Sequence, residues 1–230
     1  FGVMHGYMKI PELKKVCHAY GVSINEYLVA VYVWSVYTEC MHGMPSERPV
    51  RVAVPVNLRP YFNSITTKNF FVMVSAEFHP TKEIYTFEEV LKSVSESLRS
   101  QISRENLEKL FSYNVSNEKL LAARIVPLFL KNLAMRYVYT TSALANTATV
   151  TNIGNISVSE EYRPYVEMFH AFLAMSKGQH LKGTICSYGD TLVFSFSYDL
   201  TDTSVQRGFF RKIAADGIAV EIETNGVNYE

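Results

Sequence analysis

The chain alternates between short apolar runs and longer amphipathic stretches, and the length of each run separates strands from helices. Residues 50–57 and 69–78 are short and nearly continuous in apolar side chains, which is typical of strands covered on both faces. Residues 86–98 begin with Thr86 and then place apolar side chains at helical spacing. These side chains are Val90, Leu91, Val94 and Leu98. Strands and helices that follow one another in this way predict an α/β fold.

Sequence signals mark the ends of two helices near the N-terminus. Pro11 is well placed as the first residue of one helix, and Gly21 ends it. Ser23 then precedes Glu26 by three positions, which is a capping box in which each side chain binds an otherwise unpaired backbone N–H. The helix that opens there, to about Cys40, is apolar on almost every face. We therefore expect it to lie in the core between two layers.

The remaining elements follow from local signals. The Gly-Asp pair at 189–190 lies between two β-rich runs and predicts a hairpin with a type II′ turn. Pro127 either kinks a helix over residues 116–136 or divides it in two. Pro60 predicts an extended Arg59. We expect a strand or lead-in over residues 1–10, a helix over 11–20, strands over 137–141, 148–153, 166–173, 181–188, 191–198 and 218–223, and a helix over 203–215.

Length and composition fit one folded α/β domain over residues 1–230, a two-layer sandwich in which helices cover a mixed β-sheet. The apolar fraction is 48%, which is enough for a large core. Lysine plus arginine equals aspartate plus glutamate, at 22 each, so no overall field attracts nucleic acid. The three cysteines, Cys17, Cys40 and Cys186, are dispersed, as is typical of reduced thiols in a cytoplasmic protein.

No apolar run is long enough to cross a membrane. The longest, residues 27–37, is interrupted by Ser35, and no signal peptide precedes it. The chain begins with Phe1 in a segment that already has a strand pattern, so we expect the natural protein to extend further toward its N-terminus.

Several familiar kinds of site are disfavoured. The sequence has no GxSxG, HExxH or GxGxxG motif, and its histidines are dispersed, so neither a hydrolase elbow, a zinc site nor a phosphate-binding loop is predicted. Cys17 and His18 are neighbours on a helix, where their side chains diverge by about 100°. A buried thiol beside a surface imidazole is therefore favoured over a catalytic pair. Three aspartates near the predicted hairpin fit turns and helix caps: Asp190, Asp199 and Asp202.

Polar turns follow the predicted strands at two places, and a third segment between them repeats the strand pattern. Residues 51–60 run from an apolar strand into a turn that carries an amide and a guanidinium. Residues 69–74 repeat the strand pattern, and residues 149–155 lead a β-rich run into a second polar turn. Sites are usually built where such turns leave buried elements. In this order the three segments resemble the C-terminal half of the chloramphenicol-acetyltransferase-like superfamily, which includes condensation domains and alcohol O-acetyltransferases.

The resemblance implies a protein of two similarly folded halves that enclose a tunnel. In this superfamily a histidine acts as general base, within a motif of two histidines, three variable residues, an aspartate and usually a glycine. It takes the proton from an alcohol, amine or thiol that attacks an acyl thioester. This sequence does not contain the motif. We therefore expect a C-terminal half that has no catalytic residue of its own and does not catalyse acyl transfer alone.

The resemblance also assigns a supporting role to Asn57 and Arg59. Arg59 ends a Val-Asn-x-Arg segment, and its counterpart in the superfamily pairs with the motif aspartate of the other half. A planar guanidinium that reaches a carboxylate across an interface suits arginine better than lysine. The alternative interpretation is an exposed arginine beside a proline.

Four further residues are candidates for contact with the acyl group or the tunnel. Thr151, Asn152 and Gly154 match a Ser/Thr-Asn-x-Gly sequence, and hydroxyl or amide donors there suit an acyl oxygen as it becomes negative. The alternative is a turn in which Asn152 binds its own backbone and Gly154 takes a positive φ. Asn69, before two phenylalanines, resembles a segment that lines the acceptor side, with Lys68 in place of the usual glycine.

The leading hypothesis is the C-terminal domain of an acyl-CoA-dependent O-acyltransferase similar to alcohol acetyltransferases. The resemblance implies acetyl-CoA or another acyl-CoA as co-substrate, no covalently bound cofactor, and a small alcohol or amine as acceptor. The partner is the protein's own N-terminal half. Two alternatives are a condensation-domain half that uses carrier-protein thioesters and a non-catalytic binding or assembly module. Without the other half, apolar surface is exposed, so we also expect the chain to form homo-oligomers.

Overall fold

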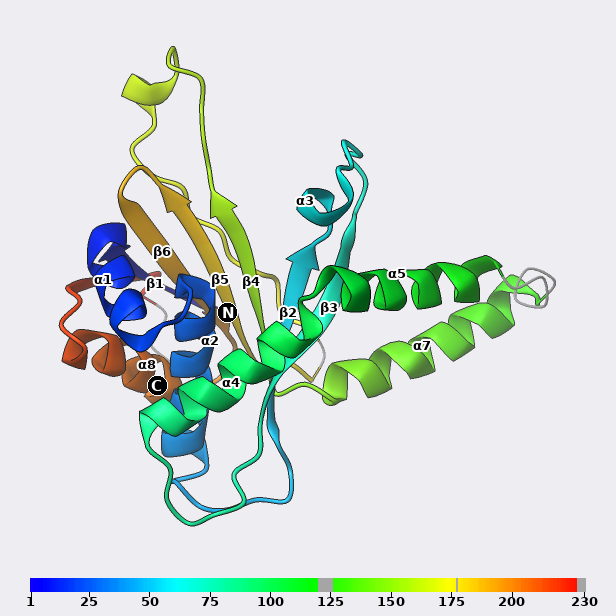
Figure 1. Ribbon diagram of the computed structural model, residues 1–230, viewed down its shortest axis with the longest axis horizontal. Coiled ribbons are helices and arrows are strands. Elements are labelled where there is room, and N and C mark those ends of the chain that lie inside the picture. Colours follow the sequence, from blue (N-terminus) through cyan, green and yellow to red (C-terminus); the bar gives the residue numbers. More distant parts are fainter. Residues whose placement is uncertain (120–125, 177, 227–230) are drawn as a thin grey trace.

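The computed structural model describes residues 1–119, 126–176 and 178–226, and only the backbone of residues 114–119 and 142–144. Seven strands in this part of the chain form one sheet in the order β3-β2-β4-β5-β6-β1-β7 (Figure 1). Strand β4 is parallel to both β2 and β5, and the other neighbours are antiparallel, so the predicted mixed sheet is confirmed. The strands are β1 (Gly2–Lys9), β2 (Val50–Asn57), β3 (Phe71–Phe78), β4 (Ala148–Asn155), β5 (Leu181–Tyr188), β6 (Thr191–Tyr198) and β7 (Val220–Thr224).

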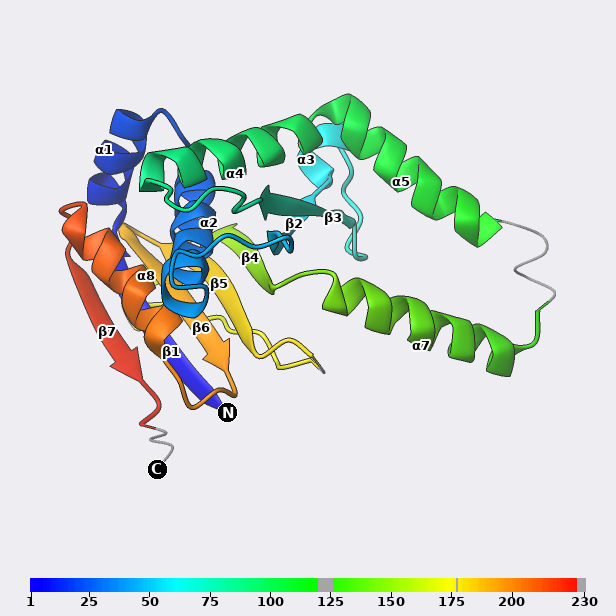
Figure 2. The same cartoon turned by 90° about the horizontal axis from the view of Figure 1, so that it is seen from below.

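Helices cover one face of this sheet, which confirms the predicted two-layer α/β architecture. Figures 1 and 2 show α1, α2, α4 and α8 on the same side of the strands, while α5 and α7 project away from the sheet. The α-helices are α1 (Ile10–Tyr20), α2 (Ile24–Ser35), α3 (Arg59–Phe62), α4 (Phe87–Gln101), α5 (Arg104–Lys119), α7 (Leu128–Leu144) and α8 (Ser204–Ala215). A π-helical turn, η1 (Val36–Cys40), extends α2, and a 3-10 turn, η2 (Arg163–Tyr165), follows β4. None of the described helices combines the length and hydropathy that a bilayer crossing requires.

Helix α2 is the centre of the core. Every residue from Tyr27 to Val33 is 0% exposed, because α2 packs between α4 and α8 and against the sheet. Its N-terminus has the predicted capping box: Glu26 N–H donates to Ser23 Oγ at 3.2 Å, and Ser23 N–H donates to the Glu26 carboxylate at 2.7 Å. The Tyr32 hydroxyl donates to the Leu181 carbonyl of β5 at 3.4 Å. An all-apolar helix requires cover on every side, and the fold provides it.

Two local signals near strand and helix ends are also confirmed. Gly21 ends α1 in the left-handed conformation, with φ 69°. The β5–β6 hairpin pairs Tyr188 with Thr191 across the predicted two-residue turn. Gly189 has φ 57° and Asp190 has no positive φ, as a type II′ turn requires.

The second face of the sheet is covered in part by an irregular segment, residues 166–176. We expected a strand over 166–173, and this is wrong: the segment lies on the sheet without joining its ladder. The Cys186 thiol donates to the Phe169 carbonyl at 3.2 Å, and the Phe169 and Tyr188 rings lie 5.3 Å apart. The apolar side chains of the segment therefore reflect cover of the sheet and not strand pairing.

The prediction for residues 116–141 is partly wrong. Residues 137–141, expected as a strand, belong to α7, where Thr141 Oγ1 donates to the Tyr137 carbonyl at 3.0 Å. The β-branched and aromatic side chains there favour a strand only when a neighbouring strand is available to pair with them. Residues 116–119 end α5, and residues 120–125 of the predicted helix lie outside the described part of the chain. Helix α7 begins directly after Pro127.

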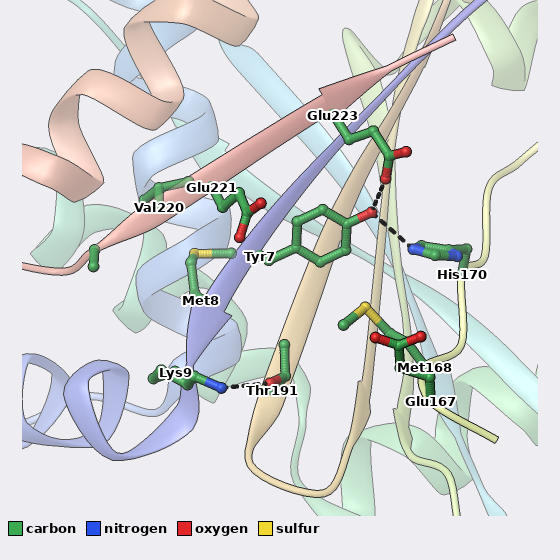
Figure 3. Close-up of a pocket in the computed structure, with 11 residues that line it drawn as sticks. Tyr7, Met8, Lys9, Glu167, Met168, His170, Thr191, Val220, Glu221 and Glu223 are labelled. Carbon is green, nitrogen blue, oxygen red and sulfur yellow. Dashed lines mark hydrogen bonds between the residues drawn. The ribbon is translucent and has the colours of Figure 1, made fainter. Parts of the chain in front are cut away.

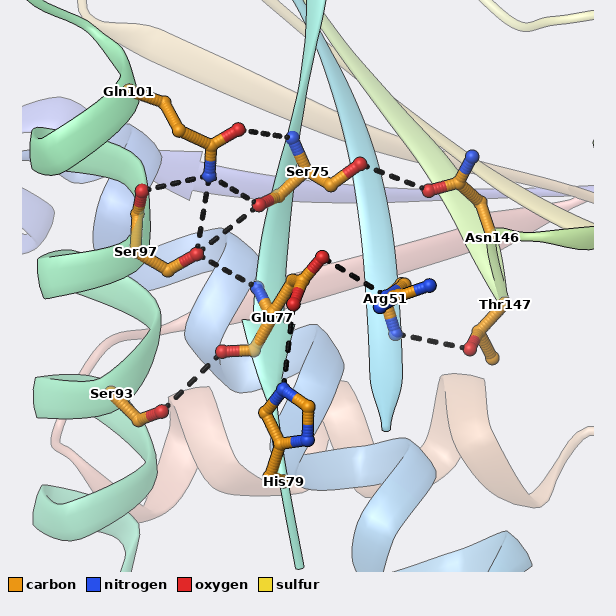
Figure 4. Close-up of polar contacts among 9 residues, drawn as sticks. All are labelled: Arg51, Ser75, Glu77, His79, Ser93, Ser97, Gln101, Asn146 and Thr147. Carbon is orange, nitrogen blue, oxygen red and sulfur yellow. Dashed lines mark hydrogen bonds and ion pairs between the residues drawn. The ribbon is translucent and has the colours of Figure 1, made fainter. Parts of the chain in front are cut away.

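Helix α4 closes one edge of the sheet. β3 is an edge strand, and the outward N–H and C=O groups of Ser75 and Glu77 bind side chains of α4 (Figure 4). Ser97 Oγ accepts from Glu77 N–H at 3.1 Å and donates to the Ser75 carbonyl at 3.2 Å. Gln101 binds both backbone groups of Ser75, and Ser93 donates to the Glu77 carbonyl. The spacing of four residues along α4 places the three side chains on one face, so the edge at Ser75 and Glu77 is not open to another strand.

Removing the central member of this row tests its role. We expect Ser97→Ala to lower the free energy of unfolding by about 1–3 kcal/mol, because a half-buried backbone N–H loses its acceptor. Urea denaturation measures the change. Ser100→Ala is the matched control, since Ser100 is exposed and its hydroxyl bonds only within its own helix. Equal effects of the two substitutions would show that the edge contact contributes nothing specific.

Candidate functional site

The candidate site lies where the sheet divides. Strands β2 and β4 form only two residue pairs in the described chain, Val52 with Ala148 and Ala53 with Thr149. Beyond these pairs β2 continues to Asn57 with β3, and β4 continues to Asn155 with β5. The two halves of the sheet therefore diverge, as Figure 1 shows. A groove of about 610 Å³ opens between them.

Five of the six residues that we selected from the sequence line this groove. They come from three separate segments of the chain: Asn57, Arg59, Asn69, Thr151 and Asn152. The sixth, Gly154, lines an adjacent hollow, which shares Asn152 with the groove. The fold thus brings together the motifs that the sequence separates by almost one hundred residues.

Apolar side chains that we did not select form the other walls. They are Pro55, Phe70, Phe71, Met73, Ile153 and Leu173. Phe71, Met73 and Ile153 are about half exposed, at 49%, 46% and 55%. Strand periodicity contained a signal for two of them, because Phe71 and Met73 alternate with buried residues of β3. Leu173 belongs to the irregular segment on the second face of the sheet. No local sequence pattern indicated that it lines the groove.

Arg59 is fixed by its own chain. Its Nε donates to the Thr66 carbonyl at 2.8 Å, and its Nη2 donates to the Lys68 carbonyl at 2.6 Å. Its Nη1 donates to Asn57 Oδ1 at 3.2 Å. Three of the five guanidinium N–H groups are therefore used to hold the turn between β2 and β3. No carboxylate of the described residues contacts Arg59, and its other N–H groups have no partner there.

Asn57, the last residue of β2, binds the first residue of the short helix α3. Its Oδ1 accepts from the backbone N–H of Arg59 at 3.1 Å, in addition to the bond from the guanidinium. We expected an extended Arg59, and this is wrong because Arg59 is the first residue of α3. Pro60 is tolerated in a first helical turn, where a missing N–H has no intrahelical acceptor. The helix directs the arginine side chain back over the 64–68 turn.

The segment from Thr151 to Gly154 has the turn geometry that we gave as an alternative. Asn152 Oδ1 accepts from Gly154 N–H at 2.8 Å, and Gly154 has φ 84°. The β4–β5 register shifts between these two residues, so a bulge redirects the strand here. Asn152 Nδ2 donates to Asn25 Oδ1 at 3.3 Å. The Asn152 side chain is thus used to shape the groove.

The Thr151 hydroxyl and the Asn69 amide remain available. Neither makes a hydrogen bond with the described residues, and both line the groove. Side chains of this kind can donate to a carbonyl oxygen. The lining contains no histidine, cysteine, aspartate or glutamate among the described residues, and arginine does not act as a proton acceptor in proteins. The groove therefore offers hydrogen-bond donors for a carbonyl oxygen, but its described lining residues include no general base.

No described group of three histidine, cysteine, aspartate or glutamate side chains could hold a metal ion. The described cysteines are free thiols: Cys17 and Cys186 are buried, and Cys40 is exposed. Burial raises the pKa of Cys17 to about 11, so this thiol is a poor nucleophile near neutral pH.

No protein-family model matches the sequence, and no curated protein matches it. Solved structures share the fold. A nonribosomal peptide synthetase, FmoA3, is 17% identical over 94% of this chain and 21% of that chain, with a TM-score of 0.61. The epimerization domain from the third module of tyrocidine synthetase B is 11% identical over 93% and 47%, with a TM-score of 0.57. The first condensation domain of the CDA synthetase is 16% identical over 93% and 43%, with a TM-score of 0.51.

These similarities define the fold. The chain has the α/β fold of condensation domains, as its resemblance to the chloramphenicol-acetyltransferase-like superfamily predicted. It spans less than half of the length of each of the three structures. Identities this low do not extend the likeness from fold to activity.

The geometry of Arg59 generates a test. We expect Arg59→Lys to loosen the turn between β2 and β3, because one ammonium group cannot replace a guanidinium that donates to three acceptors in different directions. Hydrogen exchange should speed up at the amides of Leu58 and Ser64, which donate to the Phe70 and Arg59 carbonyls. Arg48→Lys, in the preceding loop, is the control. Unchanged exchange at both amides would mean that the guanidinium does not hold the turn.

Proposed function

We propose that this chain is the tunnel-wall half of an acyltransferase, in which the groove between β2 and β4 holds the acyl group during transfer. The observation that carries the proposal is that Asn57, Arg59, Asn69, Thr151 and Asn152 meet in one groove. The sequences of their segments resemble motifs of the chloramphenicol-acetyltransferase-like superfamily, and this resemblance is independent of where the fold places them. The fold shared with a condensation domain and an epimerization domain supports the same assignment.

The chemistry of the groove suits an acyl thioester. Apolar walls accommodate an acyl chain, and the Thr151 hydroxyl and Asn69 amide are available donors. When an alcohol or amine attacks the thioester carbonyl, negative charge develops on its oxygen, and a preorganised donor there contributes about 10²–10³ in rate. The attacking group must also lose a proton. Since the lining residues that the structure describes include no base, we assign that step to the histidine motif of an N-terminal half.

Arg59 has a place in this arrangement. Its fixed position, and the N–H groups that have no partner among the described residues, suit a carboxylate presented by a second half, such as the aspartate of the histidine motif. The Arg59 guanidinium would then join the turn between β2 and β3 to the loop that carries the histidine motif in the other half. Loss of this contact should misplace the base without removing it.

The reactants follow from the resemblance. We propose acetyl-CoA or another acyl-CoA as donor and a small alcohol or amine as acceptor, with no covalently bound cofactor. We expect that the chain alone does not catalyse acyl transfer. Helix α7 exposes apolar side chains, among them Leu128, Phe129 and Tyr137 at 70–72%, which supports contact with the other half or self-association when that half is absent.

A comparison of two arginines tests this function. In the complete protein, we expect Arg59→Ala to lower kcat/KM for acetyl transfer from acetyl-CoA to simple alcohols by about 10²-fold, since misplaced catalytic groups cost rates of this order. Release of the coenzyme A thiol measures the reaction. Arg48→Ala, an exposed charge lost from the loop before β2, should leave the rate within about twofold, as expected for a surface change away from the site.

Equal effects of the two substitutions would remove Arg59 from the site. If the complete protein released no thiol from acetyl-CoA but accepted acyl groups from carrier-protein thioesters, the donor assignment would be wrong and the groove assignment would stand. If neither donor reacted, a non-catalytic binding module would replace the acyltransferase.

A further inference from the structure

A buried lysine lies close to the groove but does not line it. Lys182, the second residue of β5, is 6% exposed, and no ion pair among the described residues includes it. Burial lowers the pKa of Lys182, because the charged ammonium loses hydration. Such burial costs free energy, so the contacts that the ammonium makes need an explanation. The acyl-transfer proposal assigns it no role.

Lys182 lies beside the inner end of the groove. It pairs with Thr149 of β4, and Thr149 both lines the groove and belongs to the last residue pair of the β2–β4 ladder. Cys186, four residues further along β5, shares a face of the sheet with Lys182 because side chains alternate along a strand. The Cys186 thiol contacts the irregular segment 166–176, so Lys182 also points to the face that this segment covers.

The Lys182 ammonium holds the end of the segment 166–176. Its Nζ donates to the Ala174 carbonyl at 2.8 Å and to Ser176 Oγ at 2.6 Å. Leu173, which directly precedes Ala174, is the residue of this segment that lines the groove in the described part of the chain. The lysine therefore fixes the backbone next to a groove wall that neither β2 nor β4 provides.

The earlier part of the segment has other anchors. The Cys186 thiol donates to a backbone carbonyl of the segment at 3.2 Å. Figure 3 shows His170 of the segment beside Tyr7 of β1, and His170 Nε2 lies 2.9 Å from the Tyr7 hydroxyl. These contacts come before Leu173 in the chain, and those of Lys182 come directly after it. Loss of the lysine should therefore release Leu173 while the earlier part of the segment stays on the sheet.

We propose that Lys182 is a positioning residue that limits the room for the acyl chain by holding Leu173 at the groove. The inference deepens the proposed acyl-transfer function and rests on it. Lys182 does not line the groove, so it acts through the segment and not on the substrate. An ammonium suits this task because one buried group can donate to acceptors on two different residues.

Lys182→Met tests the contact before any ligand is added. Methionine is apolar and similar in length, so it can occupy a buried site without donating a hydrogen bond. The amide of Gln179 donates to the Ser176 carbonyl at 3.0 Å, and its hydrogen exchange should speed up about tenfold when Ser176 loses the charged donor. Lys15→Met, on an exposed position of α1, is the control. Unchanged exchange at Gln179 would overturn the proposed contact.

The acyl-chain preference of the complete protein tests the consequence. We expect Lys182→Met to raise kcat/KM for hexanoyl-CoA relative to acetyl-CoA by about tenfold, chiefly through KM, since methylenes that gain space in an apolar pocket change discrimination by at least this much. Leu173→Ala removes the wall directly and should shift the ratio by a similar factor. The double variant should shift it no further, because Lys182 acts through Leu173. Lys15→Met should leave the ratio unchanged.

The outcomes separate this inference from the proposed function. Transfer by the unaltered protein, with a ratio that Lys182→Met leaves unchanged, would overturn this inference alone. Additive shifts in the double variant would also overturn it, because the lysine would then act by another route. No transfer from any acyl thioester would overturn the proposed function and this inference together. Circular dichroism checks the fold of each variant, and Lys182→Leu takes the place of a methionine variant that does not fold.

Discussion

The early end of the β2–β4 ladder is the constraint on which the candidate site depends. After two residue pairs the strands follow different partners, and the backbone and side chains of both face a groove. A continuous ladder would bring β2 and β4 to the usual separation of about 4.8 Å and leave no space for a ligand. The divergence therefore opens a groove inside the sheet, and strands form its walls.

The rest of the fold holds this divided sheet together. The buried helix α2 spans the layer behind it, packs between α4 and α8, and contacts β2. Side chains of α4 bind the outer edge of β3, so the β2–β3 hairpin remains attached to the core although it leaves β4. At the groove itself, Arg59 closes the turn between β2 and β3, and the Asn152–Gly154 turn redirects β4.

The sequence predicted the features that local chemistry determines. The Ser23 capping box, the Gly21 helix end and the 189–190 hairpin turn require only a few neighbouring residues, and all three are confirmed. The strands predicted over residues 137–141 and 166–173 were wrong, because strand-like composition does not show whether a partner strand is present. The apolar wall at Leu173 depends on contacts between distant segments, so no local pattern indicated it. Motif resemblance identified the candidate residues of the groove. Only the three-dimensional structure shows that they lie together.

The central claim is that an acyl thioester lies in the groove between β2 and β4. The most direct test is a titration of this chain with a non-reactive thioether analogue of an acyl-CoA. Nuclear magnetic resonance monitors the titration through the amide chemical shift of each residue. The account predicts shifts that saturate and that cluster at Asn57, Asn69 and Thr151. Saturable shifts confined to β1 and β7, or no saturable shift anywhere, would contradict it.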